Sequence, residues 1–312
     1  MNALFGVGMN FLFFSLRFIP IFTNRLLLSR NSFCLNFSVL LNLFTKGMMQ
    51  TISRMKTAIY FWKLSRPVNL FLTFLTFASA CYLSDLREFR FLSDFYFWTE
   101  AVLMVIITAN GYWINDVFDY KIDRINKPEK AIVNIYLSPK KVLTGYFVSS
   151  VVVFLFSWIM PWKFICIHTV SIIVLYLYAR YFKRKAISGN LVVSAMTAMV
   201  VITGALMYHI KVPLMWMSMF AFIITLIREI TKDIEDIRGD MQFRLRTLPI
   251  QIGIRTSKQI LSLLYLVFLI TCNLPVLFGW KIQNIALFPY LIFSVVFVQL
   301  PLVYLWIKMR KS

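Results

Sequence analysis

The chain has 312 residues, of which 60% are hydrophobic and 15% are charged. Soluble globular domains are about 45–50% apolar and about 25% charged, so this composition excludes a soluble globular domain, a disordered chain and a secreted disulfide scaffold. The formal net charge is +20; in a membrane protein such a basic excess fixes orientation, so we expect no nucleic-acid partner.

Residues 1–55 form an N-terminal extension to which we assign no function. Its apolar run 33–44 is too short to cross a bilayer, which needs about 20 apolar residues. Three methionines near its end are alternative translation starts, so the extension can be a start-site artefact: Met48, Met49 and Met55. We expect the membrane domain to comprise residues 56–312.

Eight apolar stretches predict membrane-spanning helices in the rest of the chain. Their approximate ranges are 68–84, 96–114, 142–160, 163–181, 187–208, 212–228, 259–278 and 285–307. Each approaches the length of about 20 residues that a spanning helix needs, and short polar loops separate them. The expected fold is therefore all-α, a polytopic transmembrane helical bundle of about eight helices.

The distribution of basic residues predicts the orientation of this bundle. If the chain crosses at every span, one side of the membrane carries 20 Lys and Arg and the other carries five. The positive-inside rule makes the rich side cytoplasmic. We therefore expect a multi-pass protein of the cell membrane, and nine of the 13 acidic residues lie in two windows on this cytoplasmic side.

The first acidic window follows the second predicted span and contains Asn115, Asp119 and Asp123 at four-residue intervals. Residues four apart lie on one face of a helix and about 6 Å apart along its axis, so these side chains form a column. The second window follows the sixth span. Asp236 and Asp240 have the same spacing there, and Asp233 lies one helical turn earlier.

Carboxylates this dense at a membrane boundary need protonation or bound cations. Neither window contains His or Cys, and oxygen-only ligands favour Mg²⁺, Mn²⁺ or Ca²⁺ over zinc or copper. Mg²⁺ completes its coordination with phosphate and water, which suits two windows facing each other across a diphosphate. A single such window is commonly a solvated helix cap; matched spacing in two windows on one side favours a site.

With these residues the sequence resembles the UbiA superfamily of intramembrane prenyltransferases. The marks of that family are an N-x3-D-x3-D motif and a D-x3-D motif on cytoplasmic loops after the second and sixth of usually nine helices. The likeness starts near Lys63, and two further segments match: Lys63-Leu-Ser-Arg66-Pro67-Val-Asn69 and Tyr178-Ala-Arg-Tyr-Phe-Lys183-Arg184. The segment 228–240 is closest to the geranylgeranylglycerol-phosphate geranylgeranyltransferase branch, which includes digeranylgeranylglyceryl phosphate synthase-like members.

The resemblance implies a Mg²⁺-dependent prenyltransferase that moves an isoprenyl group from a geranylgeranyl diphosphate-like donor to a lipophilic acceptor in the bilayer. It implies these metal ligands: Asn115, Asp119, Asp123, Asp236 and Asp240, with Asp233 as a further candidate. We expect these cations to bind the diphosphate: Arg66, Lys127, Lys130, Lys183 and Arg246. The catalytic candidates are Asp119, Asp123, Asp236, Asp240 and Tyr178, whose ring can stabilise an allylic cation by about 0.5–2 kcal/mol.

Several alternatives remain open from the sequence. The acceptor is either a hydroxyl, as on geranylgeranylglyceryl phosphate, or an aromatic ring, as in a quinone precursor. Tyr178 is otherwise an interfacial aromatic residue, and each basic residue also satisfies the positive-inside rule. A different class of function is a divalent-cation transporter, since intramembrane carboxylates often mark ion pathways. No obligate protein partner is inferred.

Overall fold

The structure is a computed structural model that describes residues 32–85, 90–126, 128–209, 212–243, 245–277 and 294–311. The chain divides into two compact units, Met1–Ile59 and Tyr60–Ser312. Helix α2 (Ser32–Leu64) holds the described residues of the first unit and continues into the second. The expected division at 55/56 stays a prediction, because a boundary between compact units does not decide where a functional domain begins.

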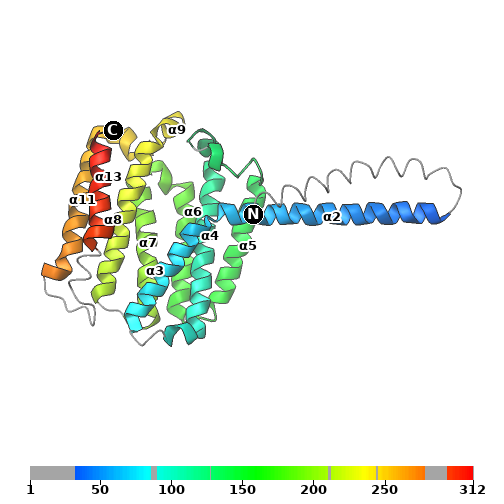
Figure 1. The fold of residues 1–312 in the computed structure, drawn as a ribbon, viewed down its shortest axis with the longest axis horizontal. Helices are drawn as coiled ribbons and strands as arrows, with labels where there is room; N and C mark the ends of the chain where they lie inside the picture. The colour runs from blue at the N-terminus through cyan, green and yellow to red at the C-terminus, as the bar shows by residue number, and fades with distance from the viewer. Residues whose placement is uncertain are drawn as a thin grey trace. The chain divides into compact units, whose positions relative to one another are not determined.

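Seven helices in the described part of the second unit are long and apolar enough to cross a membrane. They are α3 (Pro67–Asp85), α4 (Phe95–Asn126), α5 (Pro139–Ser157), α6 (Trp162–Arg180), α7 (Ser188–Met207), α8 (Val212–Glu235) and α11 (Ile254–Leu277). They match the first seven predicted spans, and the expected all-α bundle is confirmed (Figure 1). The eighth span, 285–307, lies partly outside the described residues; a π-helix, Ser294–Gln299, and α13 (Leu300–Lys311) cover its later part.

Two spans extend beyond their predicted ends and carry acidic residues out of the apolar region. Helix α4 runs to Asn126, and no Gly or Pro interrupts it between Gly111 and Pro128. Proline disfavours helical conformation in the residue before it, which fits an end at this point. Helix α8 likewise continues to Glu235. The first acidic window is therefore part of a spanning helix.

Short elements connect the spans. They are the 3-10 turns η1 (Arg90–Ser93), η2 (Pro128–Lys130) and η3 (Phe182–Arg184), the helices α9 (Ile237–Gln242) and α10 (Leu248–Ile252), and the strands β1 (Lys185–Ala186) and β2 (Arg246–Thr247). The two strands are parallel and pair Lys185 with Arg246 and Ala186 with Thr247. This pairing joins the loop after α6 to the loop after α9.

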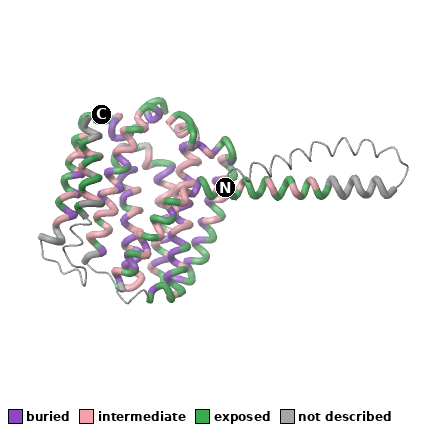
Figure 2. Tube along the Cα trace, in the orientation of Figure 1, coloured by how far each residue is buried: buried purple, intermediate pink, exposed green. Residues whose placement is uncertain are grey.

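Close packing among neighbouring spans forms the core. Helix α7 packs against α3 and α8, α4 packs against α3, α5 and α6, and α8 packs against α11. Buried positions run through the bundle on the faces that meet (Figure 2). At Gly204 on α7 an added Cβ would lie 2.7 Å from the Cβ of Ala80, so only glycine permits this approach of α3 and α7.

A polar group lies in the middle of this apolar packing. His168 on α6 contacts Glu100 on α4 through Nε2 at 2.9 Å and Ser157 at the end of α5 through Nδ1 at 2.6 Å. All three residues are fully buried. Buried polar side chains in a membrane interior need such partners because neither water nor lipid supplies them. The group therefore ties three spans together.

Candidate functional site

Both acidic windows line one cavity of about 1050 Å³. It lies where α4 and α8 leave the apolar region and where α9 packs against α4. Among the described side chains that line it, nine are carboxylates and five are Lys or Arg, which leaves four negative charges uncompensated. Such an imbalance at a membrane boundary favours binding of cations.

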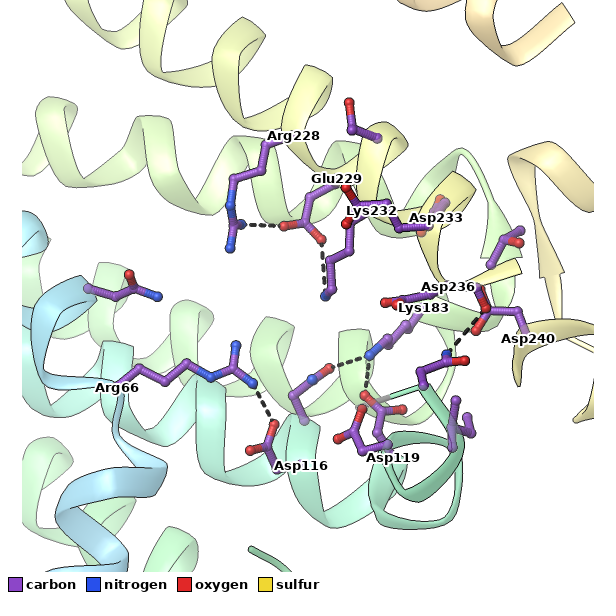
Figure 3. A pocket seen from close by; sticks show the side chains of 18 of the residues that line it. Arg66, Asp116, Asp119, Lys183, Arg228, Glu229, Lys232, Asp233, Asp236 and Asp240 are labelled. Atoms are coloured by element: carbon purple, nitrogen blue, oxygen red, sulfur yellow. Dashed lines mark hydrogen bonds and ion pairs between the residues drawn. The ribbon is translucent and has the colours of Figure 1, made fainter. Parts of the chain in front are cut away.

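The first window forms the expected column on α4. Asn115, Asp119 and Asp123 all line the cavity, and Asp119 is only 5% exposed. Lys183 reaches into this column from η3, where its ammonium donates to Asn115 Oδ1 at 3.2 Å and forms an ion pair with Asp119 (Figure 3). Burial alone would lower the pKa of Lys183, but the Asp119 carboxylate raises it above the ordinary value. Lys183 therefore stays protonated.

The second window is not one continuous helix. Helix α8 ends at Glu235 and α9 begins at Ile237, so Asp236 is the N-cap residue between them, with φ −89° and ψ 4°. The side chain of Asn126 bridges the break. Its Nδ2 donates to the carbonyl of Asp236 at 3.2 Å, which also accepts from the amide of Asp240. Its Oδ1 accepts from the amide of Gly239 at 3.0 Å. The end of α4 thus fixes the turn that carries Asp236.

The remaining acids of this window also face the cavity. Asp233 accepts a hydrogen bond from Asn190 Nδ2 at 2.9 Å, which anchors it to the start of α7. Asp240 on α9 is buried, and its burial raises the pKa of that carboxyl to about 6, an effect to which the nearby Asp236 and Asp119 carboxylates add. A metal ion near Asp240 would lower the pKa again.

A cationic side chain from the start of the bundle faces the same cavity. Arg66 stands between α2 and α3 with a positive φ of 54°, a conformation that costs a non-glycine residue energy and persists only where the surroundings impose it. Its Nη2 donates to Asp116 Oδ1 at 2.9 Å, and its guanidinium lies 4.6 Å from the ring centroid of Tyr112. These contacts hold the guanidinium beside Asp116 and Tyr112 of α4.

A second cationic group comes from α8. Arg228 donates to Glu229 Oε1 at 2.6 Å, and Lys232 lies 3.8 Å from Glu229 Oε2. Glu229 is buried, whereas the Arg228 side chain is 60% exposed. In Figure 3 the guanidinium groups of Arg66 and Arg228 lie on the side of the cavity opposite to Asp236 and Asp240. The cavity thus has an acidic end and a cationic end.

A second, smaller cavity of about 330 Å³ shares the cationic end with the first. Its other lining residues are mostly apolar side chains and threonines of α3, α4, α6 and α7. Tyr178 near the end of α6 is buried and lines both cavities. The junction therefore joins a polar chamber to an apolar one.

Most of the predicted site residues come together. Arg66, Tyr178, Lys183 and all six predicted metal ligands line the first cavity. Arg246 is exposed and is not among the lining residues. Lys127 and the side chain of Lys130 lie outside the described part of the structure.

The sequence reading missed several lining residues: Asp116, Asn126, Asn190, Arg228, Glu229 and Lys232. Helical spacing contained a signal for two of these. Arg228 and Lys232 precede Asp236 at four-residue intervals, so the helical face that carries Asp236 also carries these cations. The two asparagines could be found only from contacts between distant parts of the chain.

The donor set fits a hard divalent cation. Within the described residues no three Asp, Glu, His or Cys side chains form a ready-made metal site on their own. Mg²⁺ needs only one or two protein carboxylates when phosphate and water complete its coordination. The buried Asp119 and Asp240, oxygen ligands on two facing segments, meet that requirement.

Comparison with known proteins places these features in context. The model of the UbiA prenyltransferase family matches residues 68–312. The digeranylgeranylglyceryl phosphate synthase of Metallosphaera sedula is 34% identical over 206 residues, which are 62% of this chain and 71% of that protein.

Two solved structures resemble the fold. One, of a digeranylgeranylglyceryl phosphate synthase, has a TM-score of 0.63 at 24% identity and covers 82% of this chain and 88% of its own. A UbiA homologue from Archaeoglobus fulgidus, bound to DMAPP and Mg²⁺, has a TM-score of 0.62 at 16% identity. The match covers 79% of this chain and 86% of that one. At these identities the likeness shows the fold alone.

Proposed function

This chain belongs to the UbiA prenyltransferase family, and from that premise we propose that it moves an isoprenyl group from a prenyl diphosphate to a phosphate-bearing lipid acceptor. Its seven long apolar helices make it an integral membrane protein. The observation that carries the proposal is that both acidic windows line a single cavity. The basic excess at the loops on this side supports a cytoplasmic site.

We assign the donor diphosphate to the acidic end of the cavity, bound through Mg²⁺. The residues that would hold the ions are Asn115, Asp119, Asp123, Asp233, Asp236 and Asp240. When bound, Mg²⁺ stabilises the negative charge that develops on a departing diphosphate. Lys183 lies among these ligands and provides a fixed positive charge for the same oxygens.

The apolar cavity suits the isoprenyl tail of the donor. Its apolar lining disfavours water and would therefore help to protect an allylic cation from hydrolysis. Tyr178 lines both cavities, so its ring faces the region between diphosphate and tail. There it can stabilise positive charge on the first carbon of the prenyl group.

The cationic end of the cavity supports an anionic acceptor. Arg66, Arg228 and Lys232 line both cavities, against the carboxylates of Asp116 and Glu229. Two guanidinium groups are present there, and arginine binds phosphate through paired hydrogen bonds. The M. sedula relative is a digeranylgeranylglyceryl phosphate synthase, so we propose geranylgeranylglyceryl phosphate as acceptor and geranylgeranyl diphosphate as donor.

The reaction replaces one carbon–oxygen bond with another and moves one proton. The bond between the first prenyl carbon and the diphosphate oxygen breaks, and its electron pair leaves with the diphosphate. A lone pair of the acceptor hydroxyl forms the new carbon–oxygen bond. The hydroxyl proton passes to the departing diphosphate, which is a sufficient base. Arg66 and Arg228 would hold the acceptor so that its hydroxyl faces the prenyl carbon.

The test uses purified full-length protein in lipid nanodiscs with radiolabelled geranylgeranyl diphosphate and Mg²⁺. Three acceptors are compared: geranylgeranylglyceryl phosphate, unphosphorylated geranylgeranylglycerol and 4-hydroxybenzoate. We expect product from the phosphorylated lipid, none in EDTA, and none from Asp119→Ala or Asp236→Ala. Asp94→Asn, outside the cavity, is the matched control.

Each other outcome has a definite meaning. If only 4-hydroxybenzoate is prenylated, the proposed lipid acceptor is wrong but the proposed prenyltransferase activity stands. No product from any acceptor, together with metal-dependent ion flux in vesicles, would favour the cation transporter.

A further inference from the structure

Helix α2 carries a stripe of apolar side chains along one face. Phe44, Met48, Ile52, Met55 and Ile59 follow one another at intervals of three or four residues, the period of one helical face. Phe44 is 70% exposed, Met55 57% and Ile59 48%, whereas Met48 and Ile52 are half-buried. Large apolar side chains exposed in a row mark a surface that contacts something apolar.

The opposite face of α2 is polar and basic. Lys46, Gln50, Ser53 and Thr57 lie there at the same spacing, and Arg54 borders them. No acidic residue occurs in the chain before Asp85. The helix therefore carries uncompensated positive charge beside its apolar stripe, the combination typical of helices that lie in an anionic membrane surface.

We propose that residues 44–59 bind the interface of an anionic bilayer as an in-plane helix. The apolar stripe would enter the boundary between headgroups and acyl chains, and Lys46, Arg54 and Lys56 would contact lipid phosphates. Helix α2 has 33 residues, but it is not among the described helices that are apolar enough to cross a membrane, and this segment carries three cations.

The last turn of α2 supports this placement. Within the second unit, Phe61 packs edge-on against Trp113 of α4, with ring centroids 5.0 Å apart, and Leu64 is buried. The first span, α3, begins three residues later at Pro67. Along the chain, residues 44–59 therefore end shortly before the first span begins. The proposal does not depend on the reaction assigned to the site.

The experiment measures how deep each face of α2 lies in the full-length protein. The four native cysteines are replaced by alanine. Single cysteines are then introduced on the stripe (Ile52→Cys, Met55→Cys, Ile59→Cys) and on the opposite face (Gln50→Cys, Ser53→Cys, Thr57→Cys). Each is labelled with the fluorophore NBD in nanodiscs of phosphatidylcholine, with or without phosphatidylglycerol.

We expect blue-shifted emission and quenching by lipid-borne nitroxides at the stripe positions, and water-like emission on the opposite face. The contrast should increase with phosphatidylglycerol. Lys46→Glu, Arg54→Glu and Lys56→Glu together should abolish this effect, whereas Lys46→Arg, Arg54→Lys and Lys56→Arg should keep it. Water-like emission at all six positions, uniform protection at all six, or equal contrast in both lipids would overturn the proposal.

Discussion

The side chain of Asn126 accepts a hydrogen bond from the backbone amide of Gly239 at 3.0 Å, and an added Cβ at Gly239 would lie 2.2 Å from the accepting oxygen. This contact joins the end of α4 to the turn that carries Asp236. We predict that Gly239→Ala displaces this turn and lowers kcat/KM strongly, because catalytic groups must be held in precise geometry.

A double-mutant cycle separates this effect from general damage. Asn126→Ala alone removes two hydrogen bonds, each worth about 0.5–1.5 kcal/mol to stability. In that background the clash at Gly239 is gone, so Gly239→Ala should cost little more. Additive losses in kcat/KM would contradict the contact as the cause.

Replacing Lys183 should have opposite effects on Mg²⁺ binding and on turnover. Its ammonium compensates Asp119, so Lys183→Met should tighten Mg²⁺ binding measured without substrate. The same change should lower kcat by about 100-fold or more, because it removes a fixed charge that stabilises the leaving group. Lys183→Arg keeps the charge and should retain more of the activity. Weaker Mg²⁺ binding in Lys183→Met would disprove the compensating role.

Mg²⁺ binding should weaken at acid pH. The pKa of Asp240 is raised to about 6, so below that pH a proton must leave before the carboxylate can bind the ion. Loss of one proton predicts about tenfold weaker binding per pH unit below 6, and no such dependence on Asp240 above 7. Calorimetric titration across pH checks this. Asp240→Asn should bind more weakly but with a shallower pH dependence; an equally steep dependence would refute the assignment.

The raised pKa also affects stability without metal. A folded-state pKa above the usual value of about 3.9 favours the protonated folded protein. In EDTA, stability should therefore fall as pH rises from about 4 to about 6 and then level off. Asp240→Asn should remove part of this fall, which thermal unfolding in detergent measures.

Substitutions at the cationic end of the cavity should weaken binding of the acceptor but not binding of the donor. Hydrogen bonds to a charged group contribute about 1.5–3 kcal/mol, so Arg228→Met should raise the KM for a phosphorylated acceptor by about 10-fold to 100-fold. The KM for the prenyl diphosphate should change little. Arg228→Lys keeps the charge without the paired hydrogen bonds and should be intermediate. A rise confined to the KM of the donor would place Arg228 in the diphosphate site.

The buried pair of Glu100 and His168 should contribute to stability. Removing one partner leaves a buried polar group unpaired, so His168→Leu should destabilise the bundle by about 3–5 kcal/mol. His168→Leu combined with Glu100→Leu should cost less than His168→Leu alone. Melting temperatures in one detergent compare the three proteins. A larger loss of stability in the double variant than in His168→Leu would show that the unpaired Glu100 is not the cause of the destabilisation.

The sequence was sufficient where the determining signal is local. Apolar length predicted seven confirmed spans, and the four-residue spacing of Asn115, Asp119 and Asp123 predicted their shared face. The two motifs also predicted the family, which the family match confirms. Each of these signals lies within one short stretch of chain, where helical geometry alone determines the face of the helix on which each residue lies.

Contacts between distant segments could not be predicted in this way. The hydrogen bonds from Arg66 to Asp116 and from Asn126 to Asp236 join residues that lie 50 and 110 positions apart. Hydropathy also ended α4 and α8 too early, because the charged residues that follow are helical but not apolar. At the cationic end of the cavity, Arg66 was predicted as a site residue, whereas Arg228 and Lys232 were missed although their spacing from Asp236 contained a signal.

The parallel pairing of Lys185 with Arg246 has a mechanical consequence. It joins the peptide just after Lys183 to the peptide just after α9, and the carbonyl of Asp240 accepts from the amide of Leu245 beside it. The strand pairing therefore couples the position of the lysine to that of this aspartate. A substitution that shifts either loop should displace both side chains from the acidic end of the cavity.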